Sequence, residues 1–150
     1  MMDAIYRLAG ILESAPPHLA AIPEAEASRR PAPGRWSKKE ILGHLIDSAS
    51  NNHQRIVRTL LVPRVEFPAY AQESWVAVQG YADEPWADLV GLWSALNRHL
   101  LHVIRNMGEA AFCHEIAFGG NSPIALSALI SGYVNHLEHH LEQISAPSQT

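Results

Sequence analysis

Two histidines near the end of the sequence, His136 and His140, form its clearest chemical pattern. Residues four apart on a helix lie on the same face, so both imidazole rings can reach one metal ion. Leu129, Tyr133 and Ile144 share this face, which indicates that the two rings point toward the protein interior. Two other interpretations remain open: a solvent-facing helix end rich in histidine, or core histidines that hydrogen-bond to backbone carbonyls.

A third candidate ligand, His44, begins a run of polar side chains on one side of another predicted helix. We call this run the polar stripe; it consists of His44, Ser48, Asn51, Asn52 and Arg55. Spacing alone leaves open whether the stripe faces the core and forms a site or faces solvent while apolar neighbours pack. In the first case, Asn51 or Asn52 together with Arg55 could orient an anionic substrate, because arginine offers a planar fork of donors.

Four other residues have two interpretations each. Asp47 is either an acceptor that fixes the tautomer of a ligand ring or a surface acid. Tyr133 either closes the floor of the site or only packs in the core. Cys113, the single cysteine, is either a nucleophile or a small buried hydrophobe, and any metal site must use His, Asp or Glu. His139 could lie nearer the rim of the site, and the sequence assigns it no role.

Helical segments separated by loops rich in proline and glycine must position these residues. The second segment has the clearest start, because Ser37 and Glu40 form a capping box. The connection from Val62 to Glu84 is long for a compact domain, which predicts that the second and third helices run parallel. No strand pattern competes, so we expect an all-α four-helix bundle. The four segments are Asp3–Glu13, ending before Pro16-Pro17; Ser37 to about Leu61; Pro85 to Gly108; and Ser122-Pro123 to Pro147.

The composition suits a single globular domain over residues 1–150. Apolar residues make up 47% of the chain and charged residues 17%. The net charge of −4 and the scattered basic residues argue against nucleic acid or an anionic membrane as a partner. No apolar run reaches the length of a membrane helix and no signal peptide is evident, so we expect a cytoplasmic protein.

Two stretches of the sequence resemble motifs of the DinB/YfiT-like metalloenzymes. Residues 36–52, Trp-Ser-Lys-Lys-Glu-Ile-Leu-Gly-His-Leu-Ile-Asp-Ser-Ala-Ser-Asn-Asn, are similar to the second-helix motif of that family. Residues 136–143, His-Leu-Glu-His-His-Leu-Glu-Gln, are similar to its final-helix motif, and residues 81–86 also fit. The resemblance implies an up-down-down-up bundle with His44, His136 and His140 as ligands. It further implies nickel or zinc as the metal and a low-molecular-weight thiol as co-substrate.

Three neutral histidines leave the charge of a divalent ion uncompensated and at least one coordination position open, which is typical of a catalytic site. Such an ion can lower the pKa of a bound water or thiol. We therefore expect a metal-dependent thiol transferase or hydrolase that acts on a small molecule. The alternative is a non-catalytic stress-related metal-binding or helical interaction protein. A homodimer is expected by analogy with the family.

Overall fold

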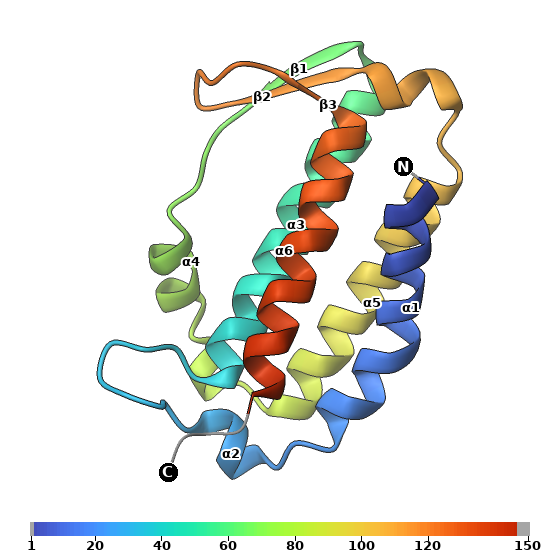
Figure 1. Ribbon diagram of the computed structural model, residues 1–150. Helices are drawn as coiled ribbons and strands as arrows, with labels where there is room; N and C mark the ends of the chain where they lie inside the picture. Colours follow the sequence, from blue (N-terminus) through green and yellow to red (C-terminus); the bar gives the residue numbers. More distant parts are fainter. Residues whose placement is uncertain (1, 147–150) are drawn as a thin grey trace.

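The computed structural model describes residues 2–146, in which four long helices form the frame (Figure 1). The helices α3 and α5 run in one direction, and α1 and α6 run in the opposite direction. This is the up-down-down-up course expected for a four-helix bundle with a long connection between the second and third helices. The four helices are α1 (Met2–Ala20), α3 (Lys38–Leu61), α5 (Trp86–Arg105) and α6 (Leu126–Ser145); the short α2 (Glu24–Ser28) precedes α3.

The capping box at the start of α3 is present as predicted. Glu40 N donates to the Ser37 hydroxyl, and Ser37 N donates to Glu40 Oε2 at 2.8 Å. Arg30 also binds the Glu40 carboxylate, which fixes the loop before the helix. These contacts satisfy two backbone donors that a helix start leaves free. The cap therefore sets the first residue of α3 and the direction in which His44 points.

The first helix continues through two prolines that were expected to stop it. The sequence predicts a helix over Asp3–Glu13, whereas α1 passes Pro16-Pro17 and ends at Ala20. Proline has a helical φ, but inside a helix it removes a backbone hydrogen bond and its ring crowds the carbonyl four residues earlier. Burial of Leu19 offsets that cost, and the Leu19 carbonyl accepts a 2.8 Å bond from Trp86 Nε1. The predicted boundary is wrong because tertiary packing holds the last turn.

The long connection folds back along α3. It contains α4 (Gln72–Gln79) and the 3₁₀ turn η1 (Tyr81–Asp83), where the sequence showed no clear period. The Tyr81 ring packs directly against Gly43 of α3, and a Cβ at position 43 would overlap that ring. This close approach fixes the connection beside the helix turn that carries His44.

A small three-stranded sheet closes one end of the bundle, and the expectation of no strands is wrong. The strand β1 (Arg64–Phe67) pairs in parallel with β2 (Glu115–Phe118), and β2 pairs antiparallel with β3 (Ile124–Ala125). Strands of four, four and two residues are too short to show alternation in sequence. In Figure 1 the sheet lies across the C-terminal end of α3, whereas His44 belongs to the second turn of that helix.

The last helix starts later than predicted. Ser122 and Pro123 were expected to open it, but α6 begins at Leu126 with Ala125 at the N-cap position. The residues before it are used by β3, and Leu126 N donates to His114 O at 2.8 Å. The helix ends at Ser145, and Pro147 lies outside the described residues.

Apolar side chains from all four long helices fill the interior of the bundle, among them the fully buried Trp93. Among the described helices, none combines the length and hydropathy that crossing a membrane requires.

Candidate metal centre

The polar stripe of α3 faces the interior, which decides the question that spacing left open. His44 is only 1% exposed, and Ser48, Asn51 and Asn52 are also buried. Arg55, the last residue of the stripe, is half-buried. Polar groups in such a position need partners, and α6 lies directly across from the start of the stripe.

A contact between the two helix ends fixes their relative positions. Lys38 Nζ donates to the carbonyl of Ile144 at 2.6 Å and forms an ion pair with Glu26 at 2.8 Å. A lysine at the last carbonyls of a helix both satisfies them and complements the helix dipole. The first turn of α3 is thus tied to the last turn of α6, one to two turns from the histidines.

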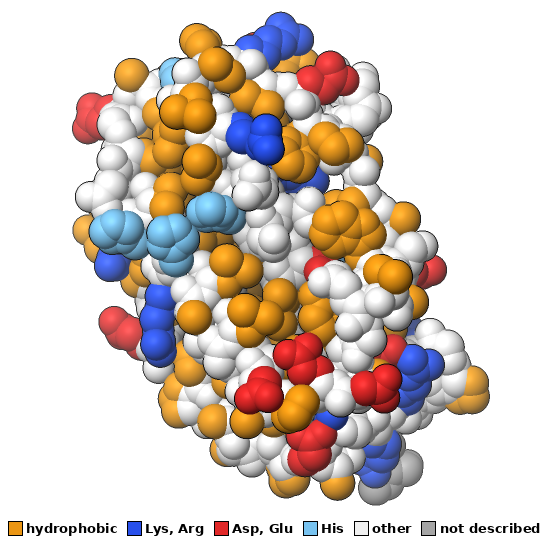
Figure 2. Space-filling view, turned by 180° about the vertical axis from the view of Figure 1, so that it is seen from behind, with side chains coloured by type: hydrophobic (Ala, Val, Ile, Leu, Met, Phe, Trp, Pro, Cys, Tyr) orange, Lys and Arg blue, Asp and Glu red, His pale blue; other side chains and the backbone are white. Residues whose placement is uncertain are grey.

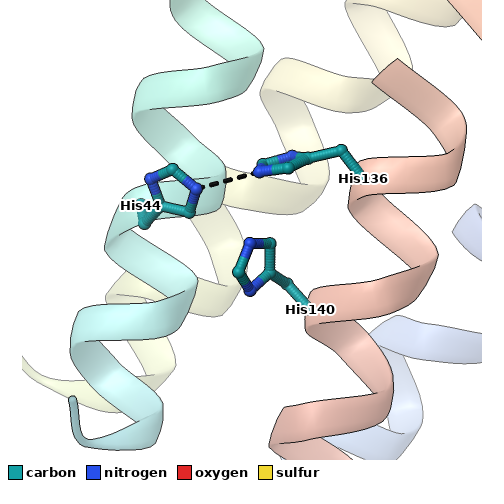
Figure 3. Close-up of side chains that lie close together, drawn as sticks. All are labelled: His44, His136 and His140. Atoms are coloured by element: carbon teal, nitrogen blue, oxygen red, sulfur yellow. Dashed lines mark hydrogen bonds between the residues drawn. The ribbon is translucent and has the colours of Figure 1, made fainter. Parts of the chain in front are cut away.

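His44, His136 and His140 form a compact triad (Figure 3). The Nε2 atoms of His44 and His136 are 3.0 Å apart, and one ligand atom from each of the three rings lies within 4.8 Å of the others. Two histidine nitrogens bound to one tetrahedral ion at 2.0–2.1 Å would be roughly 3.3 Å apart. The triad therefore fits a single transition-metal ion with only small side-chain adjustments.

The environment of the triad keeps its rings neutral. Burial, followed by the neighbouring rings, lowers the pKa of His44 to about 4 and that of His136 to about 4. Burial also lowers the pKa of His140. A neutral imidazole has a free lone pair at physiological pH, which metal binding requires.

Gln143 orients His140, a role that sequence analysis did not assign. The Nδ1–H of His140 can donate to Gln143 Oε1 at 2.9 Å, and Gln143 Nε2 donates to His139 Nε2 at 2.9 Å. A proton held on Nδ1 leaves the Nε2 lone pair of His140 free for a metal. The three-residue spacing from His140 to Gln143 was the available signal, because it places both on one face of α6. His139 is exposed and belongs to this chain of contacts.

Asp47 does not contact a ring nitrogen of the triad. Its Oδ1 accepts hydrogen bonds from Gln79 Nε2 at 2.6 Å and from the Tyr81 hydroxyl at 2.8 Å. Among the described residues, Asp47 Oδ2 and the Nδ1 atoms of His44 and His136 have no partner. Asp47 thus joins α3 to the long connection, and its proposed role as acceptor for a ligand ring stays a prediction.

Three further residues of the predicted site have internal partners. Asn51 and Asn52 donate their side-chain amides to the carbonyls of Asp47 and Ser48 in the preceding turn. These bonds use donors that an anionic substrate would need, so they do not favour the anion-orienting role. The hydroxyl of the buried Tyr133 donates to Asn97 Oδ1 on α5, which indicates a role in the core.

Cys113 lies apart from the triad. It is exposed on the 3₁₀ turn η2 (Glu109–Cys113), between α5 and the sheet, and is not buried as a small hydrophobe would be. The group of possible metal ligands in the described residues does not include it.

A surface pocket of about 720 Å³ lies beside the triad. Its lining includes Trp36, whose ring centroid is 5.3 Å from that of His44, and Gln143, which contacts His140. Glu73 of α4 forms part of another wall. A pocket of this volume is in the range of small-molecule sites.

Histidines outside the triad also lie close together, but without its geometry. Figure 2 shows histidine side chains gathered on the surface of the face opposite to that of Figure 1. Outside the triad, ring centroids are 5.2 Å apart for His53 and His99, and 6.4 Å apart for His99 and His102. Within the described residues, the triad alone brings ligand atoms from three histidines within 4.8 Å of one another.

Comparisons with known proteins agree with the fold and the kind of site. A protein of Oceanobacillus iheyensis named as a putative metal-dependent hydrolase is 26% identical over 125 residues, which cover 81% of this chain and 69% of that protein. YfiT from Bacillus subtilis, described as a probable metal-dependent hydrolase with an unusual four-helix bundle topology, superposes with a TM-score of 0.78. It is 19% identical, and the match covers 94% of this chain and 83% of YfiT.

A mycothiol-dependent maleylpyruvate isomerase gives a TM-score of 0.79 at 13% identity. The match covers 99% of this chain but only 62% of the isomerase. At such identities both structures show the shared fold alone. A sequence model of the DinB superfamily matches residues 8–144, almost the whole chain. The chain therefore belongs to the DinB superfamily.

Proposed function

We propose that this protein is a metal-dependent enzyme that holds one divalent ion, nickel or zinc, through His44, His136 and His140. The observation that carries the proposal is the convergence of three neutral imidazoles from two helices within 4.8 Å. A structural role needs no such cluster, since one buried and two half-buried rings without charge compensation or full hydrogen bonding are costly to the fold.

The triad would hold the ion with a position open toward the pocket. Bound there, the ion would lower the pKa of a thiol or water ligand and supply a nucleophile at neutral pH. The chain contributes the orientation of His140 through Gln143 and a wall against solvent from Trp36 on His44. No carboxylate belongs to the triad, so the charge of the ion would stay available to a negatively charged nucleophile.

A small thiol is our first choice of nucleophile and water the second. The named activities of the similar proteins point both ways, because one is mycothiol-dependent and two are described as metal-dependent hydrolases. The pocket beside the triad supports a small-molecule substrate. We therefore propose a thiol S-transferase-like reaction, with hydrolysis as the alternative chemistry at the same metal.

Metal analysis of protein purified without a histidine tag tests the metal site. We expect one equivalent of nickel or zinc in the wild type, less than a tenth of that in His44→Ala, and the wild-type amount in His99→Ala. The control variant removes the centre of the surface cluster seen away from the triad. Loss of metal in His99→Ala together with retention in His44→Ala would overturn the triad as the metal centre.

Activity assays then separate the two reactions. The metal-loaded protein is given a bimane-type electrophile with each of several low-molecular-weight thiols, and activated esters and amides without thiol. Thiol-dependent turnover that disappears in His44→Ala supports a transferase, and thiol-independent turnover with the same loss supports a hydrolase. Turnover that survives removal of the metal would contradict both. A metal-loaded protein inactive in every assay would favour the non-catalytic metal-binding alternative.

A further inference from the structure

Arg55 is the one charged member of the polar stripe, and it lies on the same side of α3 as His44. The two residues are eleven positions apart, or three turns, which corresponds to about 16 Å along the helix axis. A ligand that contacts both residues therefore has to extend along this face of α3.

Aromatic rings from the small sheet and the following loop surround the guanidinium of Arg55. Its Cζ lies 4.3 Å from the ring centroid of Phe118, 5.7 Å from that of Phe67 and 5.9 Å from that of Tyr70. Contacts of this kind are cation–π interactions and cover the faces of the guanidinium. They provide no hydrogen-bond acceptor for the N–H groups at its edge.

Arg55 has no anionic partner among the described residues. Its Nε is buried without a hydrogen-bond partner, and no carboxylate forms an ion pair with it. By contrast, Arg7 binds Glu138 and Arg30 binds Glu40. Burial lowers the pKa of Arg55. A half-buried cation without an anionic partner offers its free N–H groups to an anion.

The segment between β1 and α4 connects the surroundings of Arg55 with those of the triad. Tyr70 contacts Arg55, and its ring centroid is 4.8 Å from that of Trp75 on α4, the helix whose Gln79 donates to Asp47. Three residues later, Glu73 lines the pocket that Trp36 borders beside the triad. One short stretch of chain thus flanks both places.

From this geometry we propose that Arg55 binds the carboxylate of a substrate whose reactive group reaches the histidine triad. This inference rests on the proposed function for its catalytic meaning, but the binding of a carboxylate does not require it. A carboxylate matches the single charge of Arg55 and lies in the guanidinium plane as a bidentate partner. A phosphate carries nearly two charges and usually draws several donors, whereas the rings of Tyr70 and Phe118 are in contact with the guanidinium of Arg55 alone among the described cations. The carboxylate can belong to the electrophile or to the thiol.

Benzoate is the probe, because its ring suits the aromatic surroundings, and benzamide is the uncharged control. Both are titrated into the full-length protein, and the arginine Nε–H signals are followed by ¹⁵N NMR. We expect benzoate to shift the Arg55 signal in a saturable way, and benzamide to leave it unchanged. Arg55→Lys should weaken benzoate binding at least fivefold, since lysine keeps the charge and loses the planar fork. The exposed Arg58, one turn further and 5.9 Å from Phe67, gives the matched control Arg58→Lys, expected to bind as the wild type.

Three results would overturn the proposal. The first is the absence of a saturable benzoate shift at Arg55 in the wild type, a measurement that needs no variant to fold. The second is equal benzoate affinity in the wild type and Arg55→Lys. The third is binding of inorganic phosphate more tightly than benzoate at the same signal, which would assign the site to phosphate.

The same experiment separates this proposal from the metal proposal. If Arg55 binds benzoate in His44→Ala as in the wild type, the carboxylate site stands whether or not the triad holds a metal. Conversely, Arg55→Lys should take up one equivalent of metal, so loss of benzoate binding in that variant cannot be attributed to a lost metal. With an active thiol and electrophile pair in hand, a rise in KM for one of them in Arg55→Lys, with kcat little changed, identifies which carries the carboxylate.

Discussion

The two ends of the polar stripe on α3 have opposite electrostatic character. At one end, His44 faces two other rings, all three are neutral, and no carboxylate joins them. At the other end, Arg55 keeps a positive charge among aromatic rings without an anion. The first arrangement leaves lone pairs for a cation, and the second leaves N–H donors for an anion. The same face of α3 therefore offers lone pairs for a metal ion at one end and N–H donors for an anion at the other.

The largest expected effect is the loss of metal binding without a loss of benzoate binding. His136→Gln should weaken zinc or nickel binding at least 100-fold, because it removes one of three ligands whose nitrogens converge on one point. It should leave benzoate binding at Arg55 unchanged. Competition titration against a chromophoric chelator measures the first quantity, and the Arg55 Nε–H shift measures the second. If His136→Gln weakened both equally, the two ends would not be independent sites.

Acidification should destabilise the metal-free protein through the histidine end, and the lowered pKa of His53 acts in the same direction. In the unfolded chain a histidine has a pKa near 6.5, whereas His44 and His136 have pKa values of about 4 in the fold. Protons therefore bind the unfolded state first, and the stability present above pH 6.5 decreases as the pH falls toward 4. Between pH 7 and pH 5 we expect a loss of about 1–2 kcal/mol for each ring.

Urea unfolding of metal-free protein at several pH values measures this loss. The window above pH 5 avoids most of the carboxylate titration, and the raised pKa of the buried Asp47 acts in the opposite direction. His136→Gln should show a smaller loss than the wild type, because it removes one of the two rings with a pKa of about 4. An unfolding midpoint independent of pH in the wild type would mean that the rings are not held neutral by burial.

Sequence predicts the histidine end far better than the Arg55 end, and the reason is the range of the contacts. The capping box and the His136–His140 pair depend on residues three or four apart, which helical geometry brings together. The aromatic rings around Arg55, which we call the aromatic cage, include Phe67 and Phe118. These two residues pair across β1 and β2 from distant parts of the chain. Such short strands carry no local signal, so the cage becomes visible only in the fold.

The position of His44 beside the pair could not be derived from spacing either. The polar stripe allowed a buried or a solvated face, and family resemblance decided between them. The structure shows why the face is buried: Tyr81 packs against Gly43 and covers one side, while Lys38 holds the end of α6 against the start of α3. Both contacts join α3, the helix that carries His44, to residues far away in the sequence.

The packing at the histidine end should make Gly43→Ala destabilising. Alanine normally stabilises a helix interior relative to glycine by about 1 kcal/mol. At position 43, however, the new methyl group would overlap the Tyr81 ring, so we expect a net loss of about 2 kcal/mol. Gly132→Ala on α6 is the matched control, because no atom lies within 4 Å of its Cβ position, and it should gain about 0.5–1 kcal/mol. Thermal unfolding of both variants is the measurement, and a stabilised Gly43→Ala would contradict the packing of the connection on α3.

The smallest expected effect concerns the orientation of a single ring. Gln143→Ala removes the acceptor at His140 Nδ1 and should weaken metal binding about tenfold, the lower end of the range for residues that orient a ligand. Gln143→Glu should restore affinity to the wild-type level or above, since a carboxylate accepts the same proton more strongly. Glu142→Ala, at the neighbouring position that faces the groove between α1 and α6, should leave metal affinity unchanged. Equal affinities for Gln143→Ala and Glu142→Ala would show that the ring needs no such support, whereas the expected ranking would show that the histidine end is ordered by its own helix. Arg55 has no comparable partner on α3. We therefore expect a bound ligand, rather than the helix itself, to fix the orientation of its guanidinium.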